Sequence, residues 1–189
     1  TRFLATFVEI AYIYQFSYLI RLINNDVFLF IGIASWIMVF QVIISQGFVW
    51  SAILTKKQKL YYYEELGWAI IFLINTLCSL YLYFNIGYDI INNYYPLIYI
   101  NLTFGLLYLP WQLFHLQSIK FRADNKKANS NIEFNSKWSL IKQGFNDAVN
   151  LKKVSSNPKD WGGAIGLTWM ACYWATLIPT WLYYIIIAI

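Results

Sequence analysis

Polar side chains recur at helical spacing inside the long apolar stretches of this sequence, and their types are those that bind a small solute or an ion. Side chains three, four or seven positions apart share one face of a helix. Within residues 91–117, one such face carries two amides, a phenol and the only histidine of the chain. The candidate binding residues, which we call the polar seam, are Glu9, Gln41, Asn75, Asn101, Tyr108, Gln112 and His115.

The polar seam has two interpretations, and both remain open at this point. Membrane helices use amide and hydroxyl side chains to hydrogen-bond one another, and each such bond contributes about 0.6–2 kcal/mol. A seam of polar side chains through a bundle can also bind or conduct a solute. A separate set of small side chains within residues 161–189 predicts close helix packing: Gly162, Ala164, Gly166, Thr168, Ala171 and Ala175.

Several kinds of catalytic and metal chemistry are excluded by what the sequence lacks. A single histidine rules out bis-histidine haem ligation, a histidine-box di-iron centre and an HExxH zinc site. The sequence has no CxxC pair and no GxxxxGK phosphate-binding loop. As a lone general base, His115 has no nucleophile or orienting acid beside it in sequence. No catalytic residue or metal site is therefore predicted, and the cofactor is left open.

Two adjacent acids, Glu64 and Glu65, make a poor carboxylate dyad. On a helix their side chains diverge by about 100°. We expect them to balance the three lysines within residues 56–59 at the membrane surface.

Composition indicates an integral membrane protein. The sequence is 59% hydrophobic and only 12% charged, whereas a soluble domain carries about 25% charged residues. A helix needs roughly 20 apolar residues to cross a hydrocarbon layer of about 30 Å. We therefore predict an all-α, polytopic helical bundle formed by residues 1–189 as a single membrane domain. Its five predicted transmembrane helices are 3–23, 27–54, 66–86, 91–117 and 161–189.

The distribution of basic residues predicts the orientation. Every lysine and arginine except Arg21 lies near the N-terminus, in residues 55–65 or in residues 118–160. Because such residues are retained on the cytoplasmic side, we place the N-terminus and both loops there, or on the equivalent side of an organelle. The net charge of +5 then reflects topology, and nucleic-acid binding is not implied.

Residues 118–160 form the largest polar segment, and its first half is expected to be a solvated loop. Its second half places Trp138, Ile141 and Phe145 at helical spacing with lysines on the flanks, which predicts a short amphipathic helix. Such helices lie in the membrane interface and favour anionic lipid headgroups. Docking onto a partner subunit and a simple connector resting on the bundle are the alternatives.

Glu9 lies among Phe, Val, Ile and Tyr in the first predicted span. An ionisable side chain inside a membrane is costly, so by default it marks a functional site or a pair. We expect Glu9 to point inward and to pair with Arg2, Gln112 or His115. The alternative is a hydrated Glu9 in the membrane interface.

These observations favour a non-catalytic small integral membrane protein, acting as a structural or interaction subunit of a larger membrane complex or as a homo-oligomer. The alternative is a transporter, channel or binding protein for a small solute, ion or lipid that uses the polar seam. An intramembrane enzyme acting on lipid is a weaker alternative, which would need a cavity that reaches His115 from the bilayer.

Overall fold

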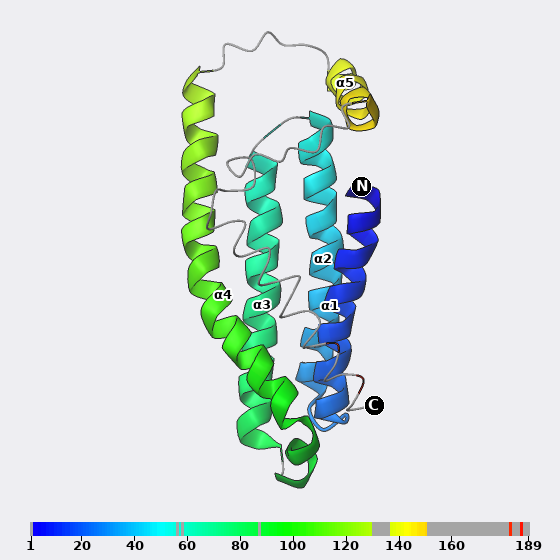
Figure 1. The fold of residues 1–189 in the computed structure, drawn as a ribbon, viewed down its shortest axis with the longest axis vertical. Helices are drawn as coiled ribbons and strands as arrows, with labels where there is room; N and C mark the ends of the chain where they lie inside the picture. Colours follow the sequence, from blue (N-terminus) through cyan, green and yellow to red (C-terminus); the bar gives the residue numbers. More distant parts are fainter. Residues whose placement is uncertain are drawn as a thin grey trace.

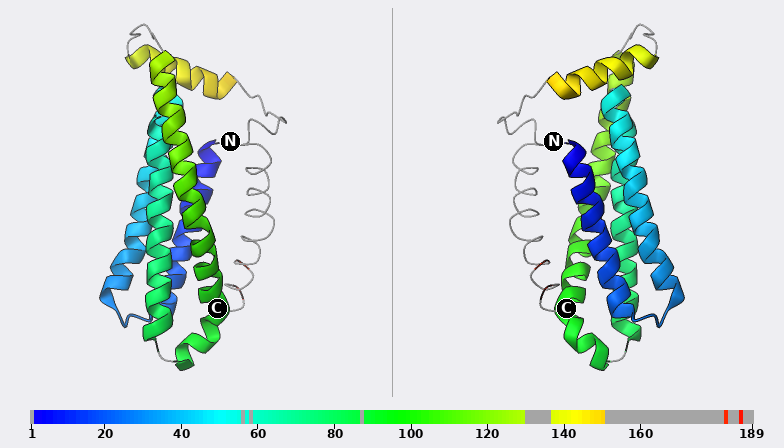
Figure 2. Two further views of the ribbon diagram at one scale, coloured as in Figure 1. Left: turned by 90° about the vertical axis from the view of Figure 1, so that its left-hand side faces the viewer. Right: turned by 90° about the vertical axis from the view of Figure 1, so that its right-hand side faces the viewer.

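The computed structural model describes residues 2–55, 57, 59–86, 88–129 and 137–150, together with residues 182 and 186. The described residues are helical apart from short turns, and no strand occurs among them. Four long helices run side by side and alternate in direction (Figure 1): α1 (Arg2–Asn24), α2 (Leu29–Thr55), α3 (Lys59–Asn85) and α4 (Tyr88–Asn129). A shorter helix, α5 (Lys137–Asn150), lies across one end of the bundle (Figure 2) and contacts α2.

Three of these helices are long and apolar enough to cross a membrane: α2, α3 and the Tyr94–Phe121 part of α4. The structure therefore supports the prediction of a membrane protein, with three helices that could span a membrane. Helix α1 covers the first predicted span but is not among the three, and it carries the ionisable Glu9 and Arg21. The fifth predicted span, residues 161–189, lies outside the described residues except for Leu182 and Ile186.

The structure moves two predicted helix boundaries. Helix α4 continues to Asn129, so residues 118–129 are helical where a solvated loop was expected. That stretch contains Lys, Arg and Ala, which are good helix formers, and it extends a helix that is already nucleated. Helix α3 begins at Lys59, which leaves only a short connection where the 55–65 loop was predicted.

The turn between α1 and α2 explains where α1 ends. Asn25 and Asp26 have φ angles of 43° and 58°, and Asn and Asp are the side chains that adopt this left-handed conformation most readily after glycine. Asn24 then holds the start of the next helix, because its Oδ1 accepts a hydrogen bond from Phe28 N at 3.1 Å and its Nδ2 donates to Phe28 O at 3.0 Å. This arrangement folds α2 back against α1.

The core of the bundle is centred on Phe72 of α3. Its ring centroid lies 5.7 Å from that of Phe16 on α1, 4.8 Å from Phe104 and 4.7 Å from Tyr108, both on α4. All four residues are buried. Aromatic contacts of this kind contribute about 0.5–1.5 kcal/mol beyond the area they bury, so Phe72 joins three helices at one level.

Two glycines allow neighbouring helices to approach closely. A Cβ added at Gly67 of α3 would overlap with Ser45 Oγ of α2 and lie 2.8 Å from Gln41 Nε2. A Cβ added at Gly105 of α4 would overlap with Thr76 Oγ1 of α3 and lie 2.9 Å from Thr76 Cβ. Small residues at such positions are typical of membrane helix interfaces. They fix α3 between α2 and α4.

Candidate functional site

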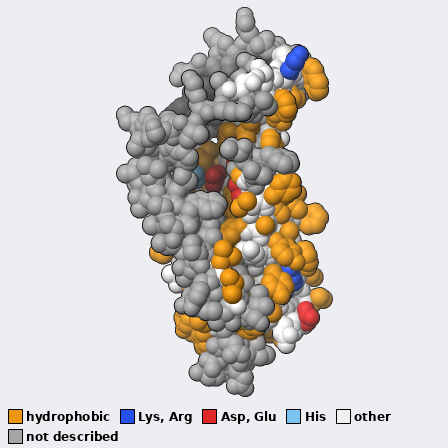
Figure 3. All heavy atoms as spheres, turned by 45° about the vertical axis from the view of Figure 1, so that its right-hand side comes forward, with side chains coloured by type: hydrophobic (Ala, Val, Ile, Leu, Met, Phe, Trp, Pro, Cys, Tyr) orange, Lys and Arg blue, Asp and Glu red, His pale blue; other side chains and the backbone are white. Residues whose placement is uncertain are grey.

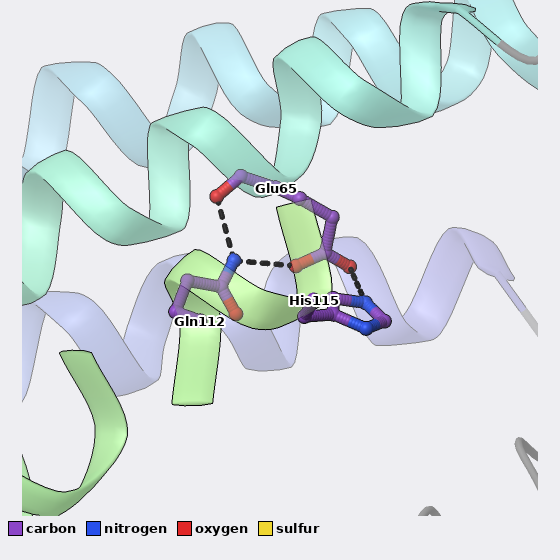
Figure 4. Close-up of polar contacts among 3 residues, drawn as sticks. All are labelled: Glu65, Gln112 and His115. Carbon is purple, nitrogen blue, oxygen red and sulfur yellow. Dashed lines mark hydrogen bonds and ion pairs between the residues drawn. The ribbon is translucent and has the colours of Figure 1, made fainter. Parts of the chain in front are cut away.

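A cluster of polar side chains joins α3 and α4 near the basic end of the bundle. Gln112 Nε2 donates hydrogen bonds to the backbone carbonyl of Glu65 at 2.8 Å and to its carboxylate Oε2 at 2.9 Å. The other carboxylate oxygen, Oε1, lies 3.8 Å from His115 Nε2. The close-up shows that the Glu65 carboxylate lies between the amide and the imidazole (Figure 4). We call these three residues the acid–imidazole cluster.

The acid–imidazole cluster is buried on one side and open on the other. Gln112 is fully buried, whereas the side chains of Glu65 and His115 are 27% and 30% exposed. The His115 ring stacks on Trp111, with ring centroids 4.8 Å apart and planes inclined by only 11°. In the space-filling view of Figure 3, acidic side chains are visible in a recess of the surface. A small ion or molecule could therefore reach the carboxylate and the imidazole.

Glu9 belongs to a second contact, between α1 and α2. Gln46 Nε2 donates a hydrogen bond to Glu9 Oε2 at 2.6 Å, and one turn further along α2, Trp50 Nε1 donates to Thr6 Oγ1 at 3.1 Å. Gln46 is buried and Glu9 is half-buried. Glu9 thus faces α2, as expected for an inward-pointing side chain, and it contacts Gln46, which was not among the predicted partners.

Two of the predicted partners of Glu9 contact a different acid, and the position of the third is not described. Gln112 and His115 contact Glu65 rather than Glu9, and the side chain of Arg2 lies outside the described residues. The geometric reason is that Glu65 projects from α3, the helix that packs directly against α4, whereas α1 and α4 touch only slightly.

The placement predicted for Glu64 and Glu65 is wrong. Glu64 is only 7% exposed, and the Glu65 carboxylate contacts Gln112 and His115 rather than lysines at the surface. The sequence did contain a signal for Glu64, because it shares the buried face of α3 with Gly67, Ile71 and Asn75 at spacings of three and four. Counting that face back from Asn75 would have placed Glu64 inside.

The middle of the bundle holds the remaining amides of the polar seam. Asn101 is fully buried and its Nδ2 lies 3.4 Å from Ser79 Oγ on α3. Asn75 is also fully buried, and neither its Nδ2 nor its Oδ1 has a hydrogen-bond partner in the part of the chain that the structure describes. A buried polar group without a partner costs about 1–3 kcal/mol. The burial of the Asn75 side chain is therefore unfavourable for the stability of the fold.

The other predicted residues have different outcomes. Tyr108 packs in the core, with its ring stacked on Phe104 at 5.2 Å, and Gln41 is half-buried beside Gly67. The predicted packing residues lie outside the described residues: Gly162, Ala164, Gly166, Thr168, Ala171 and Ala175. On α5, Trp138 and Phe145 are exposed and Ile141 is half-buried.

Sequence reasoning did not single out Gln46, which contacts Glu9, and it gave Glu65 a different role. For Gln46 a periodic signal existed, because Ser35, Val42 and Gln46 share the buried face of α2 at spacings of seven and four. For Glu65 no such signal existed, because it lies at the margin of the buried face of α3. Its contacts are with Gln112 and His115 of α4, which spacing within α3 cannot reveal.

The chemistry available to the acid–imidazole cluster is cation or proton binding. Among the described residues, no group of three or more His, Cys, Asp or Glu side chains is arranged to hold a metal ion.

Comparisons with family models, with curated proteins and with solved structures found no match.

Proposed function

We propose that this chain is a non-catalytic, multi-pass integral membrane protein that acts as a structural or interaction subunit of a larger membrane complex or as a homo-oligomer. The observation that carries the proposal is that most polar seam residues are engaged in contacts between helices. Glu9 pairs with Gln46, and Gln112 pairs with Glu65. Contacts of this kind hold membrane helices together, and they leave fewer polar groups for a transported solute.

The proposed topology has five crossings, with the N-terminus and the basic loops on the cytoplasmic or equivalent side. In support, α2 ends and α3 begins beside the exposed Lys57, and the exposed Lys120 lies near the end of α4 at the same end of the bundle. Helix α5 lies at that end as well (Figure 2). Its Trp138 and Phe145 side chains are 74% and 63% exposed, which suits contact with anionic headgroups or with a partner.

The outer faces of α2 and α4 offer large apolar side chains to their surroundings. Phe40 is 70% exposed on α2, and Leu106 and Phe114 are 68% and 72% exposed on α4. In a membrane such side chains meet lipid tails or the helices of a second protein. The interaction proposal requires that one of these faces contacts another chain.

Cysteine cross-linking in native membranes tests this requirement. In a background with Cys78 and Cys172 replaced by alanine, we expect Phe40→Cys or Phe114→Cys to give a cross-linked product of defined size under mild oxidation or with a bifunctional maleimide. A product of twice the monomer mass indicates a homo-oligomer, and any other mass a different partner. Val42→Cys, at a fully buried position of α2, is the control and should stay monomeric. Monomers at both test positions, with a monomeric mass in mild detergent, would contradict the proposal.

A second function is favoured by one observation at the acid–imidazole cluster. Glu65 and His115 are partly exposed, and the Oε1 atom of Gln112 has no hydrogen-bond partner in the described part of the chain. An accessible carboxylate and imidazole beside an unused amide oxygen suit a proton or a small cation. The second candidate is therefore a binding or transport protein for such an ion.

Proton flux into proteoliposomes separates the two functions. On the interaction proposal, we expect vesicles that contain the protein to acidify no faster than empty vesicles when an imposed potassium gradient drives proton entry. Faster acidification that is lost in both Glu65→Gln and His115→Ala would instead establish the second candidate. Glu9→Gln is the matched control, because Glu9 pairs with α2 rather than with this cluster.

A further inference from the structure

Arg21 is held in one orientation at the end of the bundle opposite the basic loops. Its Nη1 donates hydrogen bonds to Ser17 Oγ and, at 3.1 Å, to Ser35 Oγ. Both serines are fully buried. Ser17 Oγ donates to Ser35 O and Ser35 Oγ donates to Gly32 O, each at 2.7 Å. Because each hydroxyl hydrogen is directed to a carbonyl, the oxygen lone pairs remain for the guanidinium.

Two aromatic rings complete the setting of Arg21. The guanidinium carbon lies 4.2 Å from the ring centroid of Trp36 and 5.5 Å from that of Tyr14. Such cation–π contacts are strongest where water is scarce. Trp36 and Tyr14 are themselves 51% and 44% exposed, so the guanidinium lies at the outer surface of the α1–α2 pair and not inside the bundle.

The charge of Arg21 lacks a counterion in the part of the chain that the structure describes. None of its contacts there is with a carboxylate. Its Nε and Nη2 groups bond no acceptor among those residues, although a guanidinium has five N–H donors. Arg21 lies in the last turn of α1, about 5 Å along the helix axis from Asn24. Its guanidinium is directed back along α1 to Ser17, in the half of the helix that is away from the basic loops.

We propose that Arg21 binds the phosphate of a phospholipid headgroup in the leaflet opposite the basic loops. The guanidinium fork matches phosphate oxygens in a bidentate geometry. The two serines occupy Nη1 and leave Nη2 and Nε for the ligand, and the flanking Trp36 and Tyr14 are the ring types enriched at headgroup level. The proposal rests on the membrane crossing of α2 and is independent of both proposed functions.

Photo-cross-linking in bilayers of digalactosyldiacylglycerol, a lipid without phosphate, tests the proposal. A trace of phosphatidylglycerol with a diazirine in its headgroup is the probe, and a diazirine galactolipid is the comparison. We expect the phosphatidylglycerol probe to label the peptides that contain Tyr14 and Trp36 at least about ten-fold more than the galactolipid, since hydrogen bonds between charged groups are stronger than those between neutral groups. Arg21→Gln should abolish this excess, whereas Lys57→Gln at the other end should preserve it.

The remaining outcomes also decide the proposal. Arg21→Lys keeps the charge but not the fork, so it should retain only part of the labelling, and it serves as the test if Arg21→Gln does not fold. Labelling in Arg21→Lys equal to that of the wild type would overturn the proposed geometry. Equal labelling by both lipids, or labelling unchanged in a folded Arg21→Gln, would remove the site. Loss of labelling on addition of excess inorganic phosphate would show a free-phosphate site instead of a lipid site.

Discussion

The variant Gly105→Ala is expected to melt at a temperature lower than the wild type by about 2–12 °C. The added Cβ would overlap with Thr76 Oγ1 and lie 2.9 Å from both Cβ and Cγ2 of that residue. Rotation of the Thr76 side chain cannot relieve a contact to its Cβ, so α3 and α4 must move apart. Overpacking of this kind costs about 1–3 kcal/mol, and 1 kcal/mol corresponds to about 2–4 °C in a protein of this size.

The chain offers a matched control for this prediction. A Cβ added at Gly47 of α2 meets nothing within 4 Å, and alanine is favoured over glycine in a helix by about 1 kcal/mol. Gly47→Ala should therefore melt at the wild-type temperature or slightly above it. Melting followed by size-exclusion chromatography of heated, detergent-solubilised protein measures both variants. Equal melting temperatures for Gly105→Ala and Gly47→Ala would refute the close packing of α3 against α4.

Replacing Asn75 with leucine is expected to raise the melting temperature. Asn75 is fully buried, and both polar atoms of its amide lack a partner among the described residues. Removing such a group recovers a desolvation penalty of about 1–3 kcal/mol, and leucine has a similar length and adds apolar contact. The same thermal measurement tests this prediction. A decrease would mean that the amide is satisfied by a bound water or ligand in the membrane.

Gln112→Met is the counterpart of Asn75→Leu and should change stability in the opposite direction. Gln112 donates to both the backbone carbonyl and the carboxylate of Glu65, and methionine keeps its length but has no N–H donor. The loss of these contacts should lower the melting temperature. A rise in both variants would show that the polar contacts between α3 and α4 contribute nothing to stability.

The pair of variants also bears on function. Proteins retain locally unfavourable groups mainly where function requires them. If Asn75→Leu stabilises the protein and leaves oligomer formation unchanged, the amide is dispensable for the interaction proposal. If it stabilises the protein and abolishes proton flux, the amide belongs to an ion path, and the second candidate function gains direct support.

The long apolar segments made the helical bundle predictable, whereas helix ends and polar partners were harder to predict. Three segments rich in Ile, Leu and Phe became α2, α3 and much of α4, because apolar length alone determines such helices. The end of α4 was misplaced since residues 118–129 are polar, and polar composition does not distinguish a loop from a solvated helix. Their continuation as helix depends on attachment to the preceding turns.

Within the polar seam, sequence spacing identified the buried faces but not the pairing across them. Periodicity correctly placed Asn75, Asn101 and Gln112 inside. It could not show that Gln112 meets Glu65, because which helices are neighbours depends on the packing of whole faces. Glu9 illustrates the same limit. It contacts Gln46 of α2, and spacing within α1 does not indicate which helix it faces.

The length of α4 has a mechanical consequence. Its 42 residues, at about 1.5 Å each, give a path of about 63 Å along the helix axis, roughly twice the thickness of the hydrocarbon layer. The helix contains Pro96 and Pro110 and is bent (Figure 1). His115 lies about 21 Å from the end at Asn129, whereas Glu65 lies only about 9 Å from the start of α3 at Lys59. The last two turns or so of α4, about 12 Å, therefore extend beyond the start of α3 and form a lever arm. A sideways force on this arm is transmitted directly to the contact between His115 and Glu65.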